Sequence, residues 1–219
     1  MKIFEQLYNS PEINMIIDNI NEVYNKSDEN ILVACHGRYH TMFVIDTAEY
    51  ILQSLSYDSK IVELGKIAAL LHDIGSIAGR RNHARKSAAL SEVFLDDLEH
   101  LLPEEKDMII QAIADHSDGS NISGAIGAAL LIADKANISK RRILPVENID
   151  AWSKNLLAVE DVDIHISGKT IVINCITTDT FSKELMLSEY KGFHKMMKAA
   201  EYLGCDCHIQ FNGVEEIID

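Results

Sequence analysis

Four residues in the first two-thirds of this chain have the types and positions expected of metal ligands. His72 and Asp73 are adjacent and end a strongly apolar segment. An imidazole and a carboxylate in such a place are costly to bury unless something pairs them. A divalent metal ion pairs them directly, because neutral imidazole nitrogens and carboxylate oxygens are ligands for iron, manganese, zinc or nickel. Asp134 ends a second apolar run, and His40 lies upstream of both. These four residues are therefore the candidate metal site.

The spacing of apolar residues predicts the helices that would position these side chains. Apolar residues recur every three or four positions, which is typical of helices with one buried face. His40 falls in the first turns of one predicted helix, and the His72-Asp73 pair ends the next. Asp134 falls in a later helix. The predicted helices cover residues from about 11 to 23, 38 to 55, 59 to 71, 82 to 99, 103 to 116 and 124 to 137, with loops at 75–79 and 119–123.

The last third of the chain has a different pattern. Residues 162–166 alternate apolar and polar side chains, and residues 170–176 are rich in β-branched ones, with a short glycine-containing turn between them. This pattern predicts a β-hairpin. A helix that stops at Gly204 and a short strand over 208–211 are predicted to follow. The fold class is therefore mainly α, with a helical domain over 1–150 and a small α+β subdomain over 151–219.

The order of the four candidate ligands on successive helices resembles the HD superfamily, and His72-Asp73-Ile74-Gly75 is the His-Asp-Ile-Gly form of its motif. The resemblance covers about residues 35 to 142 and implies an HD-type helical bundle. It implies that His40, His72, Asp73 and Asp134 hold one metal ion, and that His83 and His116 hold a second ion with Asp73 bridging the two. The order of all six is also similar to the YqeK-like branch, which hydrolyses dinucleoside polyphosphates. In that branch the first additional histidine lies farther from the His-Asp pair.

The resemblance also implies an activity, the hydrolysis of phosphoric esters or anhydrides. Two ions about 3.5–4 Å apart can share a hydroxide that forms near neutral pH and attacks phosphorus in line with the leaving oxygen. The expected cofactors are two divalent ions, with iron or manganese favoured over zinc, nickel or magnesium. The residues expected to act in catalysis are the ligands His72 and Asp73 and the cations Arg80, Arg81 and Lys135, which would stabilise charge on the phosphoryl oxygens.

Charge indicates the kind of substrate. The chain has a formal net charge of −14, so it should repel a nucleic acid polymer. Eight of its 20 basic residues nevertheless lie in two segments, 80–86 and 135–142, each beside a candidate ligand. This favours a small anionic phosphorylated substrate. The sequence has no apolar run long enough to span a membrane and no apparent secretory signal, so we expect a cytoplasmic protein with reduced cysteines.

The ligand pattern leaves other functions open. Some HD proteins use six such ligands to activate dioxygen, so a di-iron oxygenase is one alternative. A non-enzymatic, regulatory domain that binds metal or a nucleotide is another, and the edge of the predicted hairpin could then pair with a second chain to form a homodimer. His36 is expected to be a cap or surface residue, and Trp152 to pack near the domain junction.

Overall fold

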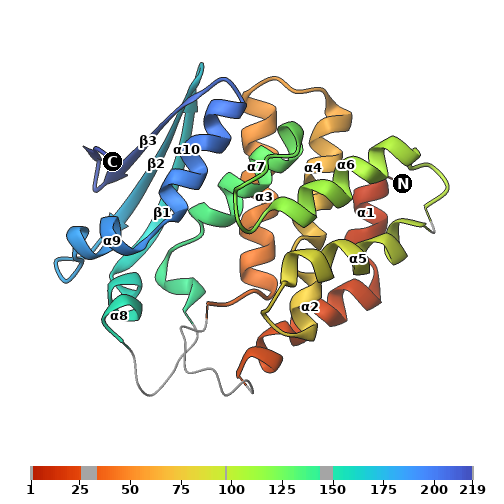
Figure 1. Cartoon of the computed structure of the whole chain (residues 1–219), viewed down its shortest axis with the longest axis horizontal. Helices are drawn as coiled ribbons and strands as arrows, with labels where there is room; N and C mark the ends of the chain where they lie inside the picture. Colours follow the sequence, from red (N-terminus) through yellow and green to blue (C-terminus); the bar gives the residue numbers. More distant parts are fainter. Residues whose placement is uncertain (1, 26–33, 97, 144–149, 219) are drawn as a thin grey trace.

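The computed structural model describes residues 2–25, 34–96, 98–143 and 150–218, without the side chains of 23–25. Figure 1 places a helical body on one side and a small sheet on the other. The body contains α1 (Ile3–Tyr8), α2 (Pro11–Asn25), α3 (Arg38–Ser54), α4 (Ser59–Leu71), the 3₁₀ helix η1 (Ile74–Ala78), α5 (His83–Asp96), α6 (Pro103–Asp115), α7 (Gly124–Ala136) and the 3₁₀ helix η2 (Lys140–Arg142).

The long helices form where the sequence predicts them because their apolar residues are buried against neighbouring helices, and α4 also has a local start signal. Asp58 begins α4 by accepting hydrogen bonds from the backbone N–H groups of Lys60 and Ile61, which would otherwise have no partner. Helix α4 packs against α3, α6 and α7. The apolar faces of these helices form the first of two hydrophobic clusters, which includes Val44, Ile67 and Leu130.

A close approach between η1 and α5 shapes the end of α4. The backbone N–H of Gly75 donates to the Ser87 hydroxyl at 2.9 Å. A Cβ atom at Gly75 would lie 2.2 Å from the Ser87 backbone nitrogen, so only glycine allows this contact. The approach brings His83, the first residue of α5, near the His72-Asp73 pair at the end of α4.

The C-terminal part contains α8 (Ala151–Leu157), β1 (Val159–Ser167), β2 (Thr170–Thr177), α9 (Lys183–Glu189), α10 (Gly192–Tyr202), β3 (Asp206–Phe211) and β4 (Val214–Glu216). The strand order is β1-β2-β3-β4. The pairs β1/β2 and β3/β4 are antiparallel, and β2/β3 is parallel. The hairpin register pairs Ser167 with Thr170, which confirms the predicted hairpin. A parallel pair needs a long connection, and α9 and α10 lie in it.

Helix α10 lies between the sheet and the helical body (Figure 1) and packs directly on α7. The second hydrophobic cluster therefore draws on both parts of the chain. It includes Leu131 and Ile132 of α7 together with Phe193 and Met196 of α10 and Ile173 of β2. The helical body and the sheet consequently share one hydrophobic cluster, in which α10 packs between them.

The predicted fold class is confirmed: the protein is mainly α, with a small C-terminal α+β part. The sequence reasoning missed α1, α8, α9 and β4, each of which is short. It also extended the fourth predicted helix to 99, whereas α5 ends at Asp96 and residues 98–100 are not helical. The predicted loop at 75–79 contains most of η1. Short elements carry too few residues for a periodic pattern, and packing decides whether they form.

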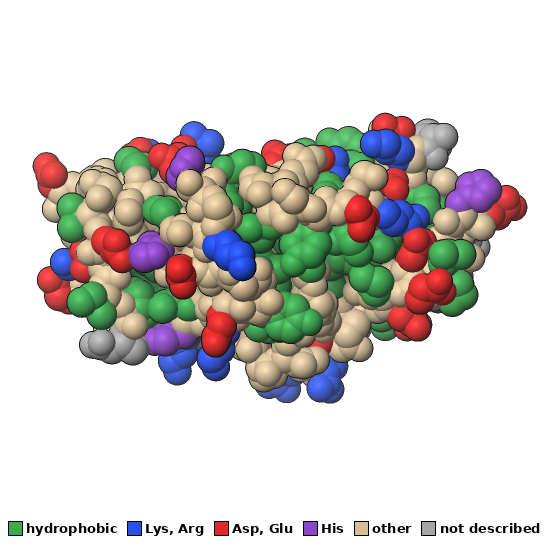
Figure 2. Space-filling view, turned by 90° about the horizontal axis from the view of Figure 1, so that it is seen from above, with side chains coloured by type: hydrophobic (Ala, Val, Ile, Leu, Met, Phe, Trp, Pro, Cys, Tyr) green, Lys and Arg blue, Asp and Glu red, His purple; other side chains and the backbone are tan. Residues whose placement is uncertain are grey.

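The surface agrees with the acidic composition. Figure 2 shows acidic side chains scattered across the whole length of one face, with lysine and arginine side chains in small separate groups among them. Among the described helices, none is long and apolar enough to cross a membrane.

Candidate metal centre

All six predicted ligands come together at one place inside the helical body. Five different helices supply them or end beside them, so no single element could build the site alone. Five of the six side chains are buried, and His83 is half-buried. The residues are His40 on α3, His72 and Asp73 after α4, His83 at the start of α5, His116 after α6 and Asp134 on α7.

Two histidines, His40 and His72, lie beside one oxygen of Asp73, and Asp134 adjoins them. The Nε2 atoms of His40 and His72 lie 3.2 Å apart. Asp73 Oδ2 lies 3.2 Å from His72 Nε2 and 3.5 Å from His40 Nε2. Asp134 Oδ1 lies 3.2 Å from His40 Nε2. His40, His72 and Asp134 thus each offer one ligand atom within 4.8 Å of the others, a spacing that could hold a metal ion.

The other oxygen of Asp73 faces the remaining two histidines. The Nε2 atoms of His83 and His116 lie 3.2 Å apart. Asp73 Oδ1 lies 3.4 Å from His83 Nε2 and 3.6 Å from His116 Nε2. His72, Asp73 and His116 form a second group that could hold a metal ion. Asp73 therefore lies between two sets of nitrogen ligands, with one oxygen toward each.

Backbone carbonyls orient three of the imidazole rings. Nδ1 of His72 lies 2.7 Å from the Ala69 carbonyl, Nδ1 of His116 lies 2.7 Å from that of Ile113, and Nδ1 of His83 lies 3.2 Å from that of Arg80. A carbonyl oxygen only accepts, so each Nδ1 carries the proton and donates it. In a neutral ring this leaves the Nε2 lone pair unprotonated and directed inward, which is the form that binds a metal.

The facing nitrogen and oxygen atoms of this cluster are unfavourable by themselves and become favourable when a cation lies between them. Two facing Nε2 lone pairs, such as those of His83 and His116, repel each other unless a proton or a cation lies between them. Both carboxylate oxygens of Asp73 are buried and have no hydrogen-bond partner among the described residues. A buried polar atom without a partner is costly. A metal ion on each side of Asp73 would remove both costs.

The electrostatics of the cluster keep both carboxylates ionised and act in opposite directions on His72 and His83. Burial alone raises the pKa of Asp73, but the surrounding histidines, His72 foremost, hold that pKa well below its usual range. Burial also acts against the charged form of Asp134, and Lys135, His40 and Arg142 outweigh it, so its pKa is likewise well below its usual range. Burial lowers the pKa of His83. Burial acts against the charged form of His72 as well, but the adjacent Asp73 outweighs it and raises the pKa of His72. The cluster therefore combines ionised carboxylates with a neutral His83 and with a His72 that holds its proton more strongly than a free imidazole does.

The three predicted cations differ in where they lie. Lys135 forms an ion pair with Asp134 at 2.6 Å, although it follows Asp134 directly on the helix. The Arg80 side chain is exposed and lines a neighbouring pocket, while its carbonyl accepts from His83. Arg81 is exposed and forms no hydrogen bond or ion pair with the six ligands in the described part of the chain. The structure thus brings Lys135 and Arg80 to the site and leaves Arg81 on the surface.

Arg142 is a site residue that the sequence reasoning did not select. Its guanidinium lies 3.4 Å from Asp134 Oδ1 and 3.3 Å from His40 Nε2. It also donates to the backbone carbonyls of Asp134 and Asn137. The only signal in the sequence is its place in the basic segment 135–142. Residue spacing could not have identified it, because Arg142 lies on η2, beyond the end of the helix that carries Asp134.

His36 corrects a prediction. It was expected to be a cap or surface residue, but it is only 9% exposed. Its ring centroid lies 5.7 Å from that of His40 and 6.1 Å from that of His83, and burial holds its pKa well below its usual range. Its backbone N–H donates to the Asn21 side chain, which ties the segment before α3 to α2, and its ring Nδ1 lies 2.7 Å from the Ala34 carbonyl. Trp152 stacks on Tyr190, at the junction where the sequence places it.

Comparison with known proteins gives the family. The family model described as the HD domain matches residues 37–155, which is more than half of the chain. Among solved structures, the crystal structure of a predicted HD superfamily hydrolase from an uncultured Thermotogales bacterium is 22% identical. The match covers 64% of this chain and 75% of that one, with a TM-score of 0.43. A search of curated proteins gave no match. On the family model alone, the chain belongs to the HD domain family.

Proposed function

We propose that this chain is a metal-dependent phosphohydrolase that cleaves a phosphoric ester or anhydride of a nucleotide or another small phosphorylated metabolite. One observation carries the proposal: Asp73 presents one carboxylate oxygen to His40 and His72 and the other to His83 and His116. A bridging carboxylate between two nitrogen-rich groups is the ligand set that a pair of divalent ions requires.

The proposed ligands divide into two sets that share Asp73. His40, His72 and Asp134 would hold one ion with Asp73, and His83 and His116 would hold the other. Iron or manganese suits this mixture of imidazole and carboxylate donors. Bound ions would lower the pKa of a water molecule toward neutrality and polarise a phosphoryl oxygen.

The chain's own cations have separate tasks in this proposal. Lys135 and Arg142 neutralise and orient Asp134, because both contact its carboxylate. Arg80 has an exposed side chain beside the cluster and is the residue we assign to the phosphoryl oxygens of the substrate. A guanidinium suits that task because its fork matches two phosphate oxygens at once.

The acidic charge of the chain supports a small substrate rather than a polymer. With a formal net charge of −14, long-range attraction to nucleic acid is absent, while the arginines beside the cluster still provide a local positive field. The order of the six ligands is similar to the YqeK-like branch, so a dinucleoside polyphosphate belongs in any substrate panel.

The proposal is tested by hydrolysis and metal content together. The protein is stripped with a chelator, reloaded with manganese or iron, and offered nucleoside mono-, di- and triphosphates and a dinucleoside polyphosphate. We expect phosphate or nucleotide release, and we expect Asp73→Asn to abolish it and to lower the metal content. Asp163→Asn, the same chemical change at an exposed position on β1, should alter neither. Full activity in Asp73→Asn would refute the assigned site.

The same preparation separates the alternatives. Substrate-dependent oxygen uptake by the iron-loaded protein, without phosphate release and without activity in manganese, would indicate an oxygenase in place of a hydrolase. Stable metal binding with neither reaction would indicate a binding domain.

A further inference from the structure

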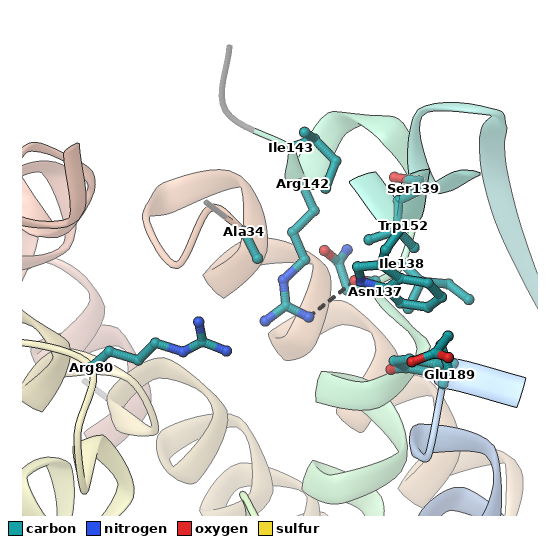
Figure 3. A pocket seen from close by; sticks show the side chains of 11 residues that line it. Ala34, Arg80, Asn137, Ile138, Ser139, Arg142, Ile143, Trp152 and Glu189 are labelled. Atoms are coloured by element: carbon teal, nitrogen blue, oxygen red, sulfur yellow. Dashed lines mark hydrogen bonds between the residues drawn. The ribbon is translucent and has the colours of Figure 1, made fainter. Parts of the chain in front are cut away.

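A cavity of about 320 Å³ lies beside the metal centre, at the junction between the helical body and the C-terminal part. Its wall comes from the loop before α5, the segment after α7, and α8 and α9 with the residue that follows α9. This volume is within the range of small-molecule sites. Figure 3 shows Arg80 on one side, Trp152 and Glu189 on the other, and Arg142 between them.

The cationic side of the cavity is joined to the metal centre. Arg142 lines the cavity and also contacts Asp134 and His40. Arg80 lines it too, and its carbonyl holds the His83 ring. In Figure 3 the Arg80 side chain extends toward the guanidinium of Arg142. An anion held by Arg80 would thus lie on the side of the cavity that Arg142 joins to the candidate metal ligands.

The opposite side has the features of a site for a flat ring. Trp152 and Tyr190 stack with ring centroids 6.0 Å apart and an interplanar angle of 19°. Ile138 and Leu156 add apolar surface. Asn137 also lines the cavity; its side chain is fully buried, and neither its Nδ2 nor its Oδ1 has a hydrogen-bond partner among the described residues. A buried amide with both groups unpaired is costly, and a ligand edge with one donor and one acceptor would satisfy it.

We propose that this cavity binds the heterocyclic ring of the substrate, a nucleobase, with its phosphate at Arg80, on the side of the cavity that Arg142 joins to the candidate metal ligands. The inference rests on the proposed hydrolysis and narrows its substrate to nucleotides. The ring packs against the Trp152 face, because every base has a π-face that stacks on an aromatic side chain. Asn137 hydrogen-bonds the edge of the base through its donor and its acceptor. The C-terminal part thereby supplies the stacking face for the base, and the helical body supplies Asn137 and carries out the chemistry.

Trp152 supplies a direct readout, because it is the only tryptophan in the chain. Purified full-length protein is titrated with adenosine, guanosine, cytidine and uridine and with their monophosphates, and the fluorescence is corrected for light absorbed by the base. We expect saturable quenching by at least one nucleoside, tighter binding of its monophosphate, and no quenching by ribose 5-phosphate. Absence of saturable quenching by all of the nucleosides and monophosphates, or equal quenching by ribose 5-phosphate, would overturn the proposal.

Variants locate the binding. Asn137→Ala should weaken nucleoside binding about tenfold, whereas Asn19→Ala, the same change at an exposed position of α2, should leave it unchanged. Trp152→Leu removes the fluorophore, so nucleoside binding to this variant is measured by calorimetry. We expect about tenfold weaker binding, as for one lost base-stacking contact. This variant tests the site if Asn137→Ala does not fold. Wild-type affinity in a folded Asn137→Ala or Trp152→Leu protein would refute the assignment.

A nucleoside carries no phosphate to cleave, so the two proposals fail separately. Nucleoside binding without hydrolysis of the phosphate panel would refute the enzymatic proposal and keep the ring site. Hydrolysis without nucleoside binding would refute the ring site and keep the enzymatic proposal.

Discussion

At the scale of single residues, contacts outside the candidate metal centre hold its candidate ligands in place. The carboxylate of Asp134 has Lys135 on one oxygen and Arg142 on the other. Arg142 also ties the end of α7 to η2 through the carbonyls of Asp134 and Asn137. Partners of this kind set the orientation and the basicity of a ligand.

Arg142→Ala should therefore lower metal affinity or activity by about 10- to 100-fold, the usual effect of losing a group that orients a ligand. Arg142→Lys should recover only part of this, because an ammonium cannot reach the carboxylate and both carbonyls together. Arg141→Ala removes the same charge from an exposed neighbour and serves as the control. Metal titration of all three variants makes the comparison, and equal affinities would contradict the role given to Arg142.

Cys175 provides a prediction about pH. Its side chain is fully buried on β2, and burial raises the pKa of the thiol from 9.0 to about 12. The folded state thus keeps a proton that the unfolded state loses above pH 9.0. The unfolding free energy should fall as pH rises from 9.0 toward 12, by up to about 1.4 kcal/mol per pH unit from this thiol.

Urea unfolding of the wild type and of Cys175→Ala over this range measures the effect. The variant starts less stable because it leaves a cavity, so the slopes are compared and not the absolute values. We expect a shallower loss of stability with pH in the variant. Identical slopes would mean that the thiol ionises normally in the folded protein.

At the scale of elements, the contact between η1 and α5 sets the position of His83. Gly75 allows it, because a Cβ there would lie 2.2 Å from the Ser87 nitrogen and 2.5 Å from the Lys86 carbonyl carbon. Both are backbone atoms of a helix and cannot move independently. The glycine of the His-Asp-Ile-Gly motif thus acts on the second group of ligands through helix packing.

Gly75→Ala should destabilise the protein by about 1–3 kcal/mol or more, as overpacking does, and should weaken metal binding by displacing His83. Gly65→Ala is the matched change. Its Cβ would meet Leu52 Cδ1 at 2.4 Å, the end of a flexible side chain, and alanine also favours the helix by about 0.5–1 kcal/mol. Urea unfolding should show a clearly smaller loss for Gly65→Ala, and comparable losses would contradict this account.

At the scale of the whole molecule, the shared hydrophobic cluster makes the two parts depend on each other. The sequence suggests a division near residue 150, and a chain cut there would expose Leu131 and Ile132 of α7, which are buried with α10. Phe193 of α10 belongs to this shared cluster, is only 1% exposed, and lies against the Tyr190 and Phe211 rings.

Phe193→Ala should cost about 3–5 kcal/mol and should lower the stability of both parts together. Trp152 fluorescence reports the C-terminal part and far-ultraviolet circular dichroism reports the helices, so coincident transitions would indicate one cooperative unit. Tyr202→Ala removes an exposed aromatic ring from the same helix and should change little. Two separate transitions would instead support independent domains.

The sequence by itself determined the helical class and the hairpin, and it indicated the candidate ligands His72, Asp73 and Asp134. These follow from local patterns: apolar periodicity fixes which face of a helix is buried, and polar groups at a buried helix end are costly without a partner. His83 and His116 entered the candidate site only through the resemblance to the HD superfamily. The short elements α1, α8, α9 and β4 could not be predicted in this way, because tertiary packing decides whether such short segments fold.

The tertiary structure alone decided how these residues meet. It placed one oxygen of Asp73 toward each group of histidines, brought Arg142 onto Asp134, and turned His36 inward. It also formed the cavity that Asn137 and Trp152 line beside the candidate metal centre. Each of these depends on the approach of segments far apart in the chain, and the distances and angles between such segments are set by packing that no local pattern contains.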